Sequence, residues 1–243
     1  MKLPTKITPD RIRDSIVQVF FKSDIPFLPL IGYFHSYLSS MSYEYISEVK
    51  EKEKKNIISL DFLNHLFVNT ELGVKISLHP TKSIIFNCTG NYIGWSKYNI
   101  AIIDVIGKFI EVGLIREVVR VGVRFTSEFP NINILEKVNF DYHYQIDKEK
   151  IKSGKFNIEY LDENNCRVIL NIVSNAPLNP FTDIKGKVDT LSLIDIDIIK
   201  EKFTHSDLNK IKEIIFDTHE KQKRVFFSLL KKEFLDELNP EYD

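Results

Sequence analysis

Apolar and polar residues alternate along several stretches of the chain, and a period of two predicts β-strands. Alternation of this kind, or a short run rich in β-branched and aromatic residues such as 14–22, predicts strands. They lie at about residues 14–22, 46–53, 72–78, 83–88, 117–125, 137–146, 155–161, 166–174 and 190–199. The alternation is clearest in the stretch before Thr126, where successive side chains point to opposite faces. One face carries Val119, Val121, Val123 and Phe125, and the other carries Arg120, Gly122 and Arg124.

Three other stretches place apolar residues three or four positions apart, which predicts helices. They lie at about residues 27–42, 95–114 and 207–235. Gly113 is expected to end the second helix, and Thr204 or Ser206 is expected to cap the third. Residues 56–78 are ambiguous, and we interpret them as a loop or short helix around 60–67 followed by a strand.

The order of these elements predicts an α+β fold with mostly antiparallel sheets. Residues 14–129 follow the βαββαβ order of a ferredoxin-like module, with additional material in the ambiguous region. The second half gives four strands and then the long helix, a ββββα module, with a hairpin predicted at the polar turn 162–165. We therefore expect domains at 1–130 and 131–243. No flexible linker separates them, so we expect them to pack as one unit.

Composition and charge exclude several classes of protein. The 243 residues carry 33 Lys+Arg against 34 Asp+Glu, a net charge of −1, whereas nucleic-acid-binding proteins usually have a basic bias. Two cysteines do not make a disulfide framework. The first residues lack the apolar core of a secretory signal, and no apolar stretch suits a membrane span. We expect a cytoplasmic protein that binds neither membrane nor nucleic acid.

Sequence motifs for catalysis or cofactor binding are absent. The chain contains no GxxxxGK[ST], GxGxxG, GxSxG or HExxH pattern, which argues against nucleotide-hydrolase, Rossmann, serine-hydrolase and zinc-protease functions. The six histidines are scattered without a second ligand at metal-binding spacing. We therefore expect no metal and no cofactor.

Two pairs of charged residues are the best candidates for a ligand site. Arg120 and Arg124 share a strand face, and Gly122 between them leaves room for a ligand or another backbone. Two arginines in this arrangement suit a phosphate or carboxylate. Asp195 and Asp197 likewise share one face of a strand, where they can bind a cation, act as acid and base, or neutralise the arginines. We favour the structural role for both pairs.

His219 is the remaining candidate. Together with Gln222 it interrupts the apolar stripe of the last predicted helix, so its side chain is expected to be buried. An unpaired buried polar group costs about 1–3 kcal/mol, so His219 needs partners from the sheet that the helix covers. A hydrogen-bonded core histidine is favoured over a catalytic one.

Several motifs together resemble a known group of proteins. They are an early strand at 14–21, Trp95-Ser96-Lys97-Tyr98, Arg120-Val121-Gly122-Val123-Arg124-Phe125, Ile194-Asp195-Ile196-Asp197, His219-Glu220 and Phe226-Phe227, after a Leu3-Pro4 start. In this order they resemble a sporadically distributed family of uncharacterised bacterial proteins. The resemblance implies a bacterial origin and places both arginines in a shared motif. The order of the second half also resembles SecB-like chaperones in topology.

These observations favour a non-enzymatic binding or regulatory protein, chaperone-like or associated with defence or a toxin–antitoxin system. Its 18 Phe and 10 Tyr suit a surface that recognises a protein or peptide partner through an apolar groove. The alternative is an enzyme or a nucleotide or anion sensor that uses Arg120 and Arg124 with Asp195, Asp197 and His219. The apolar end of the last helix packs between the modules or, in a homodimer, against a second copy. We favour packing between the modules.

Overall fold

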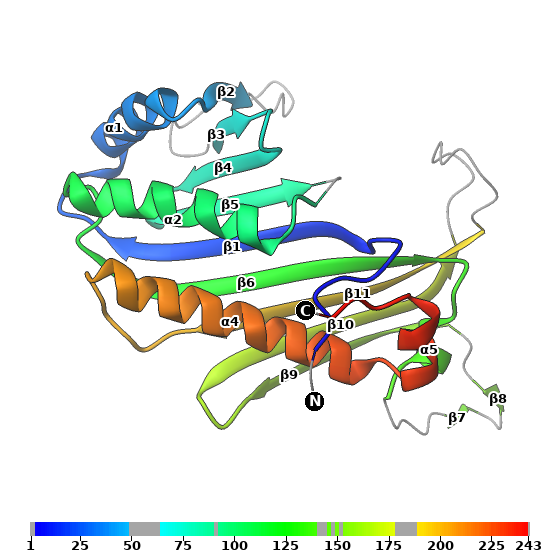
Figure 1. Cartoon of the computed structure of the whole chain (residues 1–243). Coiled ribbons are helices and arrows are strands. Elements are labelled where there is room, and N and C mark those ends of the chain that lie inside the picture. Colours follow the sequence, from blue (N-terminus) through cyan, green and yellow to red (C-terminus); the bar gives the residue numbers. More distant parts are fainter. Residues whose placement is uncertain are drawn as a thin grey trace. The chain divides into compact units, whose positions relative to one another are not determined.

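The computed structural model describes residues 3–48, 64–89, 92–139, 145–146, 149–150, 153–177 and 189–242. These residues form an α+β fold with a mostly antiparallel sheet, which confirms the predicted class (Figure 1). The sheet has nine strands in the order β2-β3-β4-β5-β1-β6-β11-β10-β9, and β7 pairs separately with β8.

The strands are β1 (Ile12–Lys22), β2 (Glu44–Glu48), β3 (Asn64–Asn69), β4 (Val74–His79), β5 (Ser83–Thr89), β6 (Glu117–Pro130), β7 (Gln145–Ile146), β8 (Glu149–Lys150), β9 (Gly154–Leu161), β10 (Cys166–Pro177) and β11 (Thr190–Lys200). The helices are α1 (Phe27–Ser40), α2 (Trp95–Glu111), α3 (Ile134–Lys137), α4 (Leu208–Leu229) and α5 (Lys232–Glu237).

The chain divides into two compact units, each built from segments that are distant in sequence. Unit 1 comprises residues 1–13, 124–198 and 218–243, and unit 2 comprises residues 14–123 and 199–217. Strands β6 and β11 and helix α4 contribute residues to both units. The division into domains 1–130 and 131–243 stays a prediction.

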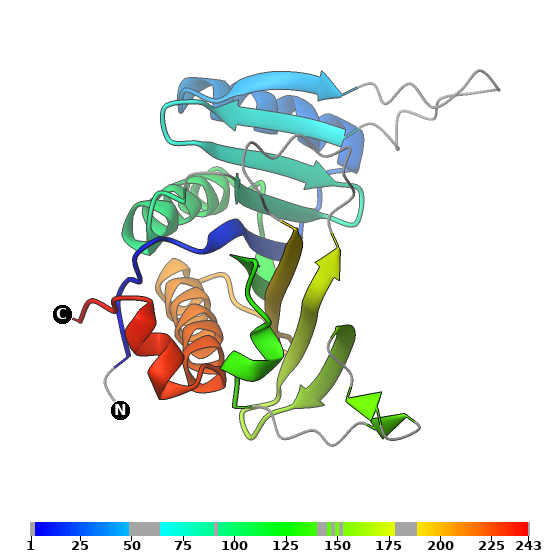
Figure 2. The ribbon, with the colours of Figure 1, turned by 90° about the vertical axis from the view of Figure 1, so that its right-hand side faces the viewer.

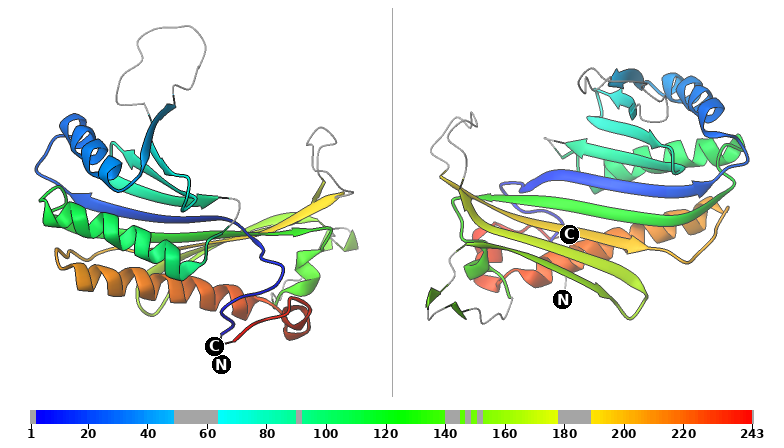
Figure 3. Two further views of the ribbon diagram at one scale, coloured as in Figure 1. Left: turned by 45° about the horizontal axis from the view of Figure 1, so that its top comes forward. Right: turned by 180° about the vertical axis from the view of Figure 1, so that it is seen from behind.

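In unit 2, helices α1 and α2 pack against one face of the strands (Figure 3). The alternation of β1 buries Val17 and Val19 on this face, and β1 pairs antiparallel with β5. Phe34 of α1 contacts Phe109 of α2, with 4.0 Å between the ring centroids. A Cβ on Gly107 of α2 would lie 2.9 Å from Cδ2 of Leu208, so glycine lets α4 begin close to α2.

Tyr98, from the Trp-x-x-Tyr sequence, has a structural role in unit 2. Its side chain is fully buried, and its hydroxyl lies 2.8 Å from the carbonyl oxygen of Phe86 and 3.2 Å from that of Ser15. These carbonyls belong to neighbouring strands, so one hydroxyl links α2 to both. Burial raises the pKa of Tyr98 and keeps the phenol neutral.

In unit 1, helices α3 and α5 and the second half of α4 lie on one side of strands β9, β10 and β11 (Figure 2). The apolar core lies between these layers, and its strand residues include Val168, Leu170, Ile172, Ile194, Ile196 and Ile198. Residues near the two ends of the chain pair with each other. The N–H of Thr5 donates to the carbonyl oxygen of Glu241, and the N–H of Glu241 donates to that of Lys6, both at 2.8 Å.

The predicted long helix is in fact two helices. Helix α4 ends at Leu229 and α5 begins at Lys232, because Leu230 forms an antiparallel bridge with Val138. The N–H of Lys231 donates to the carbonyl oxygen of Lys137 at 2.9 Å. Beyond the break, Phe234 packs against Phe129, with ring centroids 5.7 Å apart.

Other predicted elements also need correction. The loop or short helix expected around 60–67 is wrong from residue 64 onward, where β3 begins. The strand expected at 137–146 is wrong at its start, since Lys137 ends helix α3. Its residues 140–144 lie outside the described residues, as do residues 49–53 of the strand expected at 46–53. The described part of that strand belongs to β2, which starts earlier.

The predicted hairpin is confirmed in β9 and β10, which pair antiparallel. The Asp162 carboxylate holds the turn by accepting the N–H groups of Asn164 at 3.0 Å and Cys166 at 2.6 Å. Asn165 has φ +54°, a left-handed conformation that asparagine tolerates.

Candidate functional site

The six candidate residues fall into two groups. Arg124, Asp195, Asp197 and His219 belong to unit 1, and the segment with Arg120 and Gly122 belongs to unit 2.

In unit 1, Arg124 of β6 and Asp195 of β11 form a two-pronged ion pair. The Nε of Arg124 donates to Oδ1 of Asp195, and its Nη2 donates to Oδ2, both at 2.8 Å. This parallel geometry is the strong form of an arginine–carboxylate interaction. The arginine therefore neutralises the aspartate across the strands, which is the structural role favoured for the pair.

Two more donors complete this network around Asp195. Thr126 Oγ1 lies 3.3 Å from Oδ1, and Nδ2 of Asn171 donates to Oδ2 at 3.2 Å. The side chain of Asp195 is 11% exposed, and that of Arg124 is 48% exposed. A molecule arriving from solvent therefore meets the arginine, held in a fixed orientation by a carboxylate beneath it.

Half-buried apolar side chains surround the Arg124–Asp195 network. Ile169 and Val173 stand two residues either side of Asn171 on β10, and Leu193 stands two residues before Asp195 on β11. Alternation places all of them on the network's face, opposite the apolar core. No helix among the described residues covers this face of unit 1 (Figure 3, right). We call it the open face of unit 1.

The remaining strand candidates take separate positions. Asp197 is half-buried on the same side of β11 as Asp195, which confirms that the two share a face. In unit 2, the Arg120 guanidinium lies over the ring of Phe20, with Cζ 4.8 Å from the ring centroid. Gly122 is half-buried two residues further along β6.

His219 is buried under the sheet of unit 1, on the side opposite the Arg124–Asp195 network. Its ring lies 5.7 Å from that of Phe125, which follows Arg124 in β6 and therefore points to the other face. Burial, with a smaller contribution from Lys223, lowers the pKa of His219 to about 3. The imidazole is therefore neutral at physiological pH, and the sheet separates it from the network.

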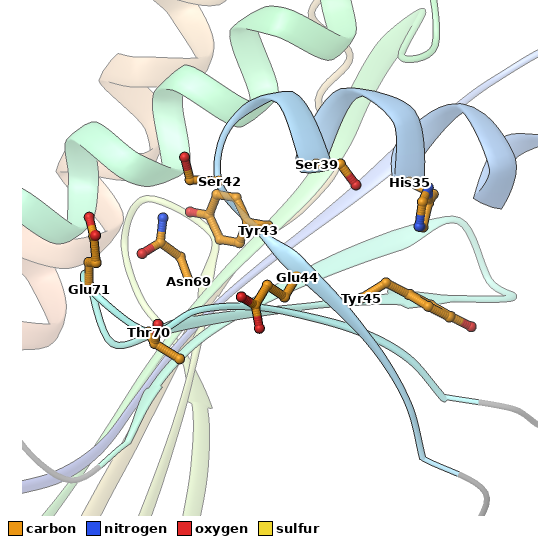
Figure 4. A pocket seen from close by; sticks show the side chains of 9 residues that line it. All are labelled: His35, Ser39, Ser42, Tyr43, Glu44, Tyr45, Asn69, Thr70 and Glu71. Atoms are coloured by element: carbon orange, nitrogen blue, oxygen red, sulfur yellow. The ribbon is translucent and has the colours of Figure 1, made fainter.

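Unit 2 has a pocket of about 570 Å³ that includes none of the six candidates (Figure 4). It is lined by His35, Ser39, Ser42, Tyr43, Glu44, Tyr45, Asn69, Thr70 and Glu71. Burial and the nearby carboxylate of Asp104 raise the pKa of Tyr43 to about 12. The lining is mostly polar, so this pocket differs from the apolar peptide groove that the sequence predicts.

Sequence reasoning missed Thr126 and Asn171, the two neutral members of the network. Asn171 follows the buried Leu170 and precedes the buried Ile172. A polar residue at an alternate strand position is usually assigned to solvent, so its pairing with Asp195 carries no local signal.

In the described ranges, no three His, Cys, Asp or Glu side chains gather as a metal site. None of the helices within those ranges is long and apolar enough to cross a bilayer. A scan against protein-family models gave no match, and a search of curated proteins also gave none.

Proposed function

We propose that this chain is a non-enzymatic binding protein that recognises an extended protein or peptide segment on the open face of unit 1. The observation that carries the proposal is the half-exposed arginine of the Arg124–Asp195 network, surrounded by half-buried Ile169, Val173 and Leu193. Protein-binding surfaces combine such arginines with apolar contacts.

The network suits recognition better than catalysis. The Arg124 guanidinium is held by Asp195 before any partner arrives, so little side-chain entropy is lost on binding. The carboxylate also offsets the arginine's charge, which favours a neutral acceptor such as a peptide carbonyl over a phosphate. The enzyme alternative requires His219 at the same site. His219 instead lies under the sheet, against Phe125, which does not support that alternative.

A peptide-display library panned on the full-length protein tests this proposal. Selected peptides should carry alternating apolar residues. Their binding should weaken at least about tenfold in the variants Leu193→Lys and Val173→Lys, because each places a charge among the apolar contacts. Ile100→Lys is the matched control, since Ile100 is an exposed apolar residue of α2 in unit 2.

Thermal melts must first show that each variant is folded. Selected peptides that bind folded Leu193→Lys and Val173→Lys as tightly as the wild type would overturn the proposal. Failure of the library to yield any peptide that binds the wild type would do the same.

A finer fold and a cellular setting belong to the same proposal. The order β4-β5-β1-β6, with α1 after β1 and α2 before β6, supports a ferredoxin-like βαββαβ module into which β2 and β3 are inserted. We also propose a bacterial cytoplasmic protein similar to the sporadically distributed family, with a defence or toxin–antitoxin role.

A further inference from the structure

Among the residues that the structure describes, strand β9 ends the strand order of the sheet, and β10 is its neighbour in that order. We propose that β9 of a second copy of this chain occupies its other edge, antiparallel and about a twofold axis at Asn157. This inference rests on β9 and goes beyond the peptide-binding proposal. An edge strand exposes alternate backbone N–H and C=O groups that another strand can pair with.

The hairpin geometry identifies which groups of β9 face outward. The N–H of Asp162 donates to the carbonyl oxygen of Cys166 at 3.0 Å, directly across the antiparallel pair. Such hydrogen-bonded positions recur at every second residue. In the unbroken register of β9 and β10, the backbone groups of Phe156 and Ile158 therefore face β10, and those of Asn157 face away.

The outward-facing residues are self-complementary in charge. With the axis at Asn157, Lys155 of one copy lies opposite Glu159 of the other, and the pair repeats on the far side of the axis. These two pairs and the central Asn157 pair each exchange two backbone hydrogen bonds. The side chains of all three lie on the open face, where opposite charges facing each other stabilise a strand pair.

Other antiparallel registers lack this match. An axis at Lys155 places two lysines opposite each other, and an axis at Glu159 places two glutamates opposite each other. Charges on an edge strand normally discourage pairing. In β9 the charges of Lys155 and Glu159 also select one register and one partner. Only a strand that presents a negative and a positive charge at the same spacing neutralises both residues.

The helix side of β9 also matches in this register. Phe156 lies opposite Ile158 of the second copy, and both already pack partly against the core of unit 1. Tyr160 lies opposite Gly154, whose missing side chain leaves room for an aromatic ring. Tyr160 is 45% exposed in the single chain, so pairing covers apolar surface.

On the open face, Arg167 of β10 holds the Glu159 carboxylate, with Nη1 and Oε1 3.4 Å apart. This contact positions Glu159 for Lys155 of the second copy. Because the twofold axis is perpendicular to the sheet, pairing joins the two open faces into one continuous surface.

Mass measurement of the full-length protein by light scattering over a range of concentrations tests the pairing. The wild type should reach twice the 28.4 kDa of the chain. Asn157→Pro removes an outward-facing N–H at the axis and should give a monomer. Asn157→Ala is the matched control. It loses the same side chain, keeps the N–H and should remain dimeric.

A charge exchange tests the register. Lys155→Glu and Glu159→Lys should each weaken self-association at least about tenfold, since each places like charges opposite each other. An equimolar mixture of the two variants should form a mixed dimer, because every pair is then opposite in sign. A general folding defect would not produce this selective recovery.

A wild type that stays monomeric at all concentrations would overturn the pairing, and so would a dimer that Asn157→Pro leaves intact. A monomer that still binds the selected peptides would leave the proposed function standing. A dimer that binds no peptide would reject the proposed function alone.

Discussion

Asp195 and His219 lie on opposite sides of the sheet of unit 1 and are buried to a similar extent, with side chains 11% and 9% exposed. Asp195 has an arginine within 2.8 Å and two neutral donors around it. His219 lies against the ring of Phe125, with the cationic Lys223 nearby and the Glu220 carboxylate 3.4 Å from its Nδ1. The Asp195 carboxylate is therefore compensated by Arg124, whereas burial, with a smaller contribution from Lys223, disfavours a charged His219 even with Glu220 beside it.

The comparison shows that the surroundings, more than the depth of burial, decide what a polar side chain can do. The aspartate fixes an arginine at the surface, where a partner can reach it. The histidine fills core space as a neutral group and has no access to the open face. Measurements on His219 and Asp195 test this difference, and a third on Arg120 extends it to a charged residue of unit 2.

The largest effect is expected from acid. The pKa of His219 is lowered from 6.5 to about 3 in the folded protein, so below pH 6.5 the unfolded chain binds a proton that the folded chain excludes. The stability present above pH 6.5 is therefore lost as the pH falls towards 3. The loss should be about 3 kcal/mol at pH 4.5. Urea unfolding at a series of pH values measures it.

The variant His219→Leu should lose much less stability over the same pH range, since it has no proton to exclude. His79→Gln is the matched control, because it removes a histidine that is exposed at the end of β4. Parallel profiles for the wild type and His219→Leu would contradict the burial argument.

An intermediate effect is expected from Asp195→Ala. It leaves Asn171 and Thr126 without their acceptor and Arg124 without its counter-ion, at a cost of about 2 kcal/mol after allowing for the arginine's access to water. Chemical denaturation at pH 7 measures the change. Replacing both charged partners, Arg124→Leu with Asp195→Leu, should cost less than Asp195→Ala. If the double variant is less stable than Asp195→Ala, the Arg124–Asp195 pair contributes net stability.

The smallest effect is expected from Arg120→Ala in unit 2. The Arg120 guanidinium stacks on Phe20, and such contacts contribute about 0.5 kcal/mol near a surface. Denaturation of Arg120→Lys beside Arg120→Ala checks whether the cation or the planar group matters. A loss above about 2 kcal/mol would mean that Arg120, like Arg124, supports a larger network.

The elements most accurately predicted from sequence are those whose burial follows a single period. Strand β6 shows this from Val121 onward, because Val121 and Val123 are buried and Arg124, next in sequence, is exposed. Before Val121 the period breaks, since Val118 is buried and Val119, predicted on the buried face, is only half-buried. The sequence also allows an Arg124–Asp195 pair, since both residues are on the polar faces of their predicted strands. Thr126 and Asn171, the neutral members of the network around Asp195, could not be predicted, because their roles depend on which strands become neighbours.

The prediction was wrong where tertiary contacts override the local pattern. In β3, both faces carry apolar residues, and the polar His65 and Asn69 are buried, so no period of two is visible. At the end of α4, Leu230 fits the helical spacing, yet the chain leaves the helix to pair with Val138. A bridge to a residue about ninety positions earlier leaves no trace in the local sequence.

The division of unit 1 into three separate segments has a consequence for synthesis on the ribosome. Residues 1–13 and 124–198 belong with residues 218–243, so the unit stays incomplete until its last segment has emerged. Unit 2 likewise waits for residues 199–217, long after its first 110 residues have been made. Contacts between such distant segments slow folding and leave unpaired strands exposed in the meantime. The nascent chain is therefore expected to need protection from aggregation until residues 218–243 have emerged from the ribosome.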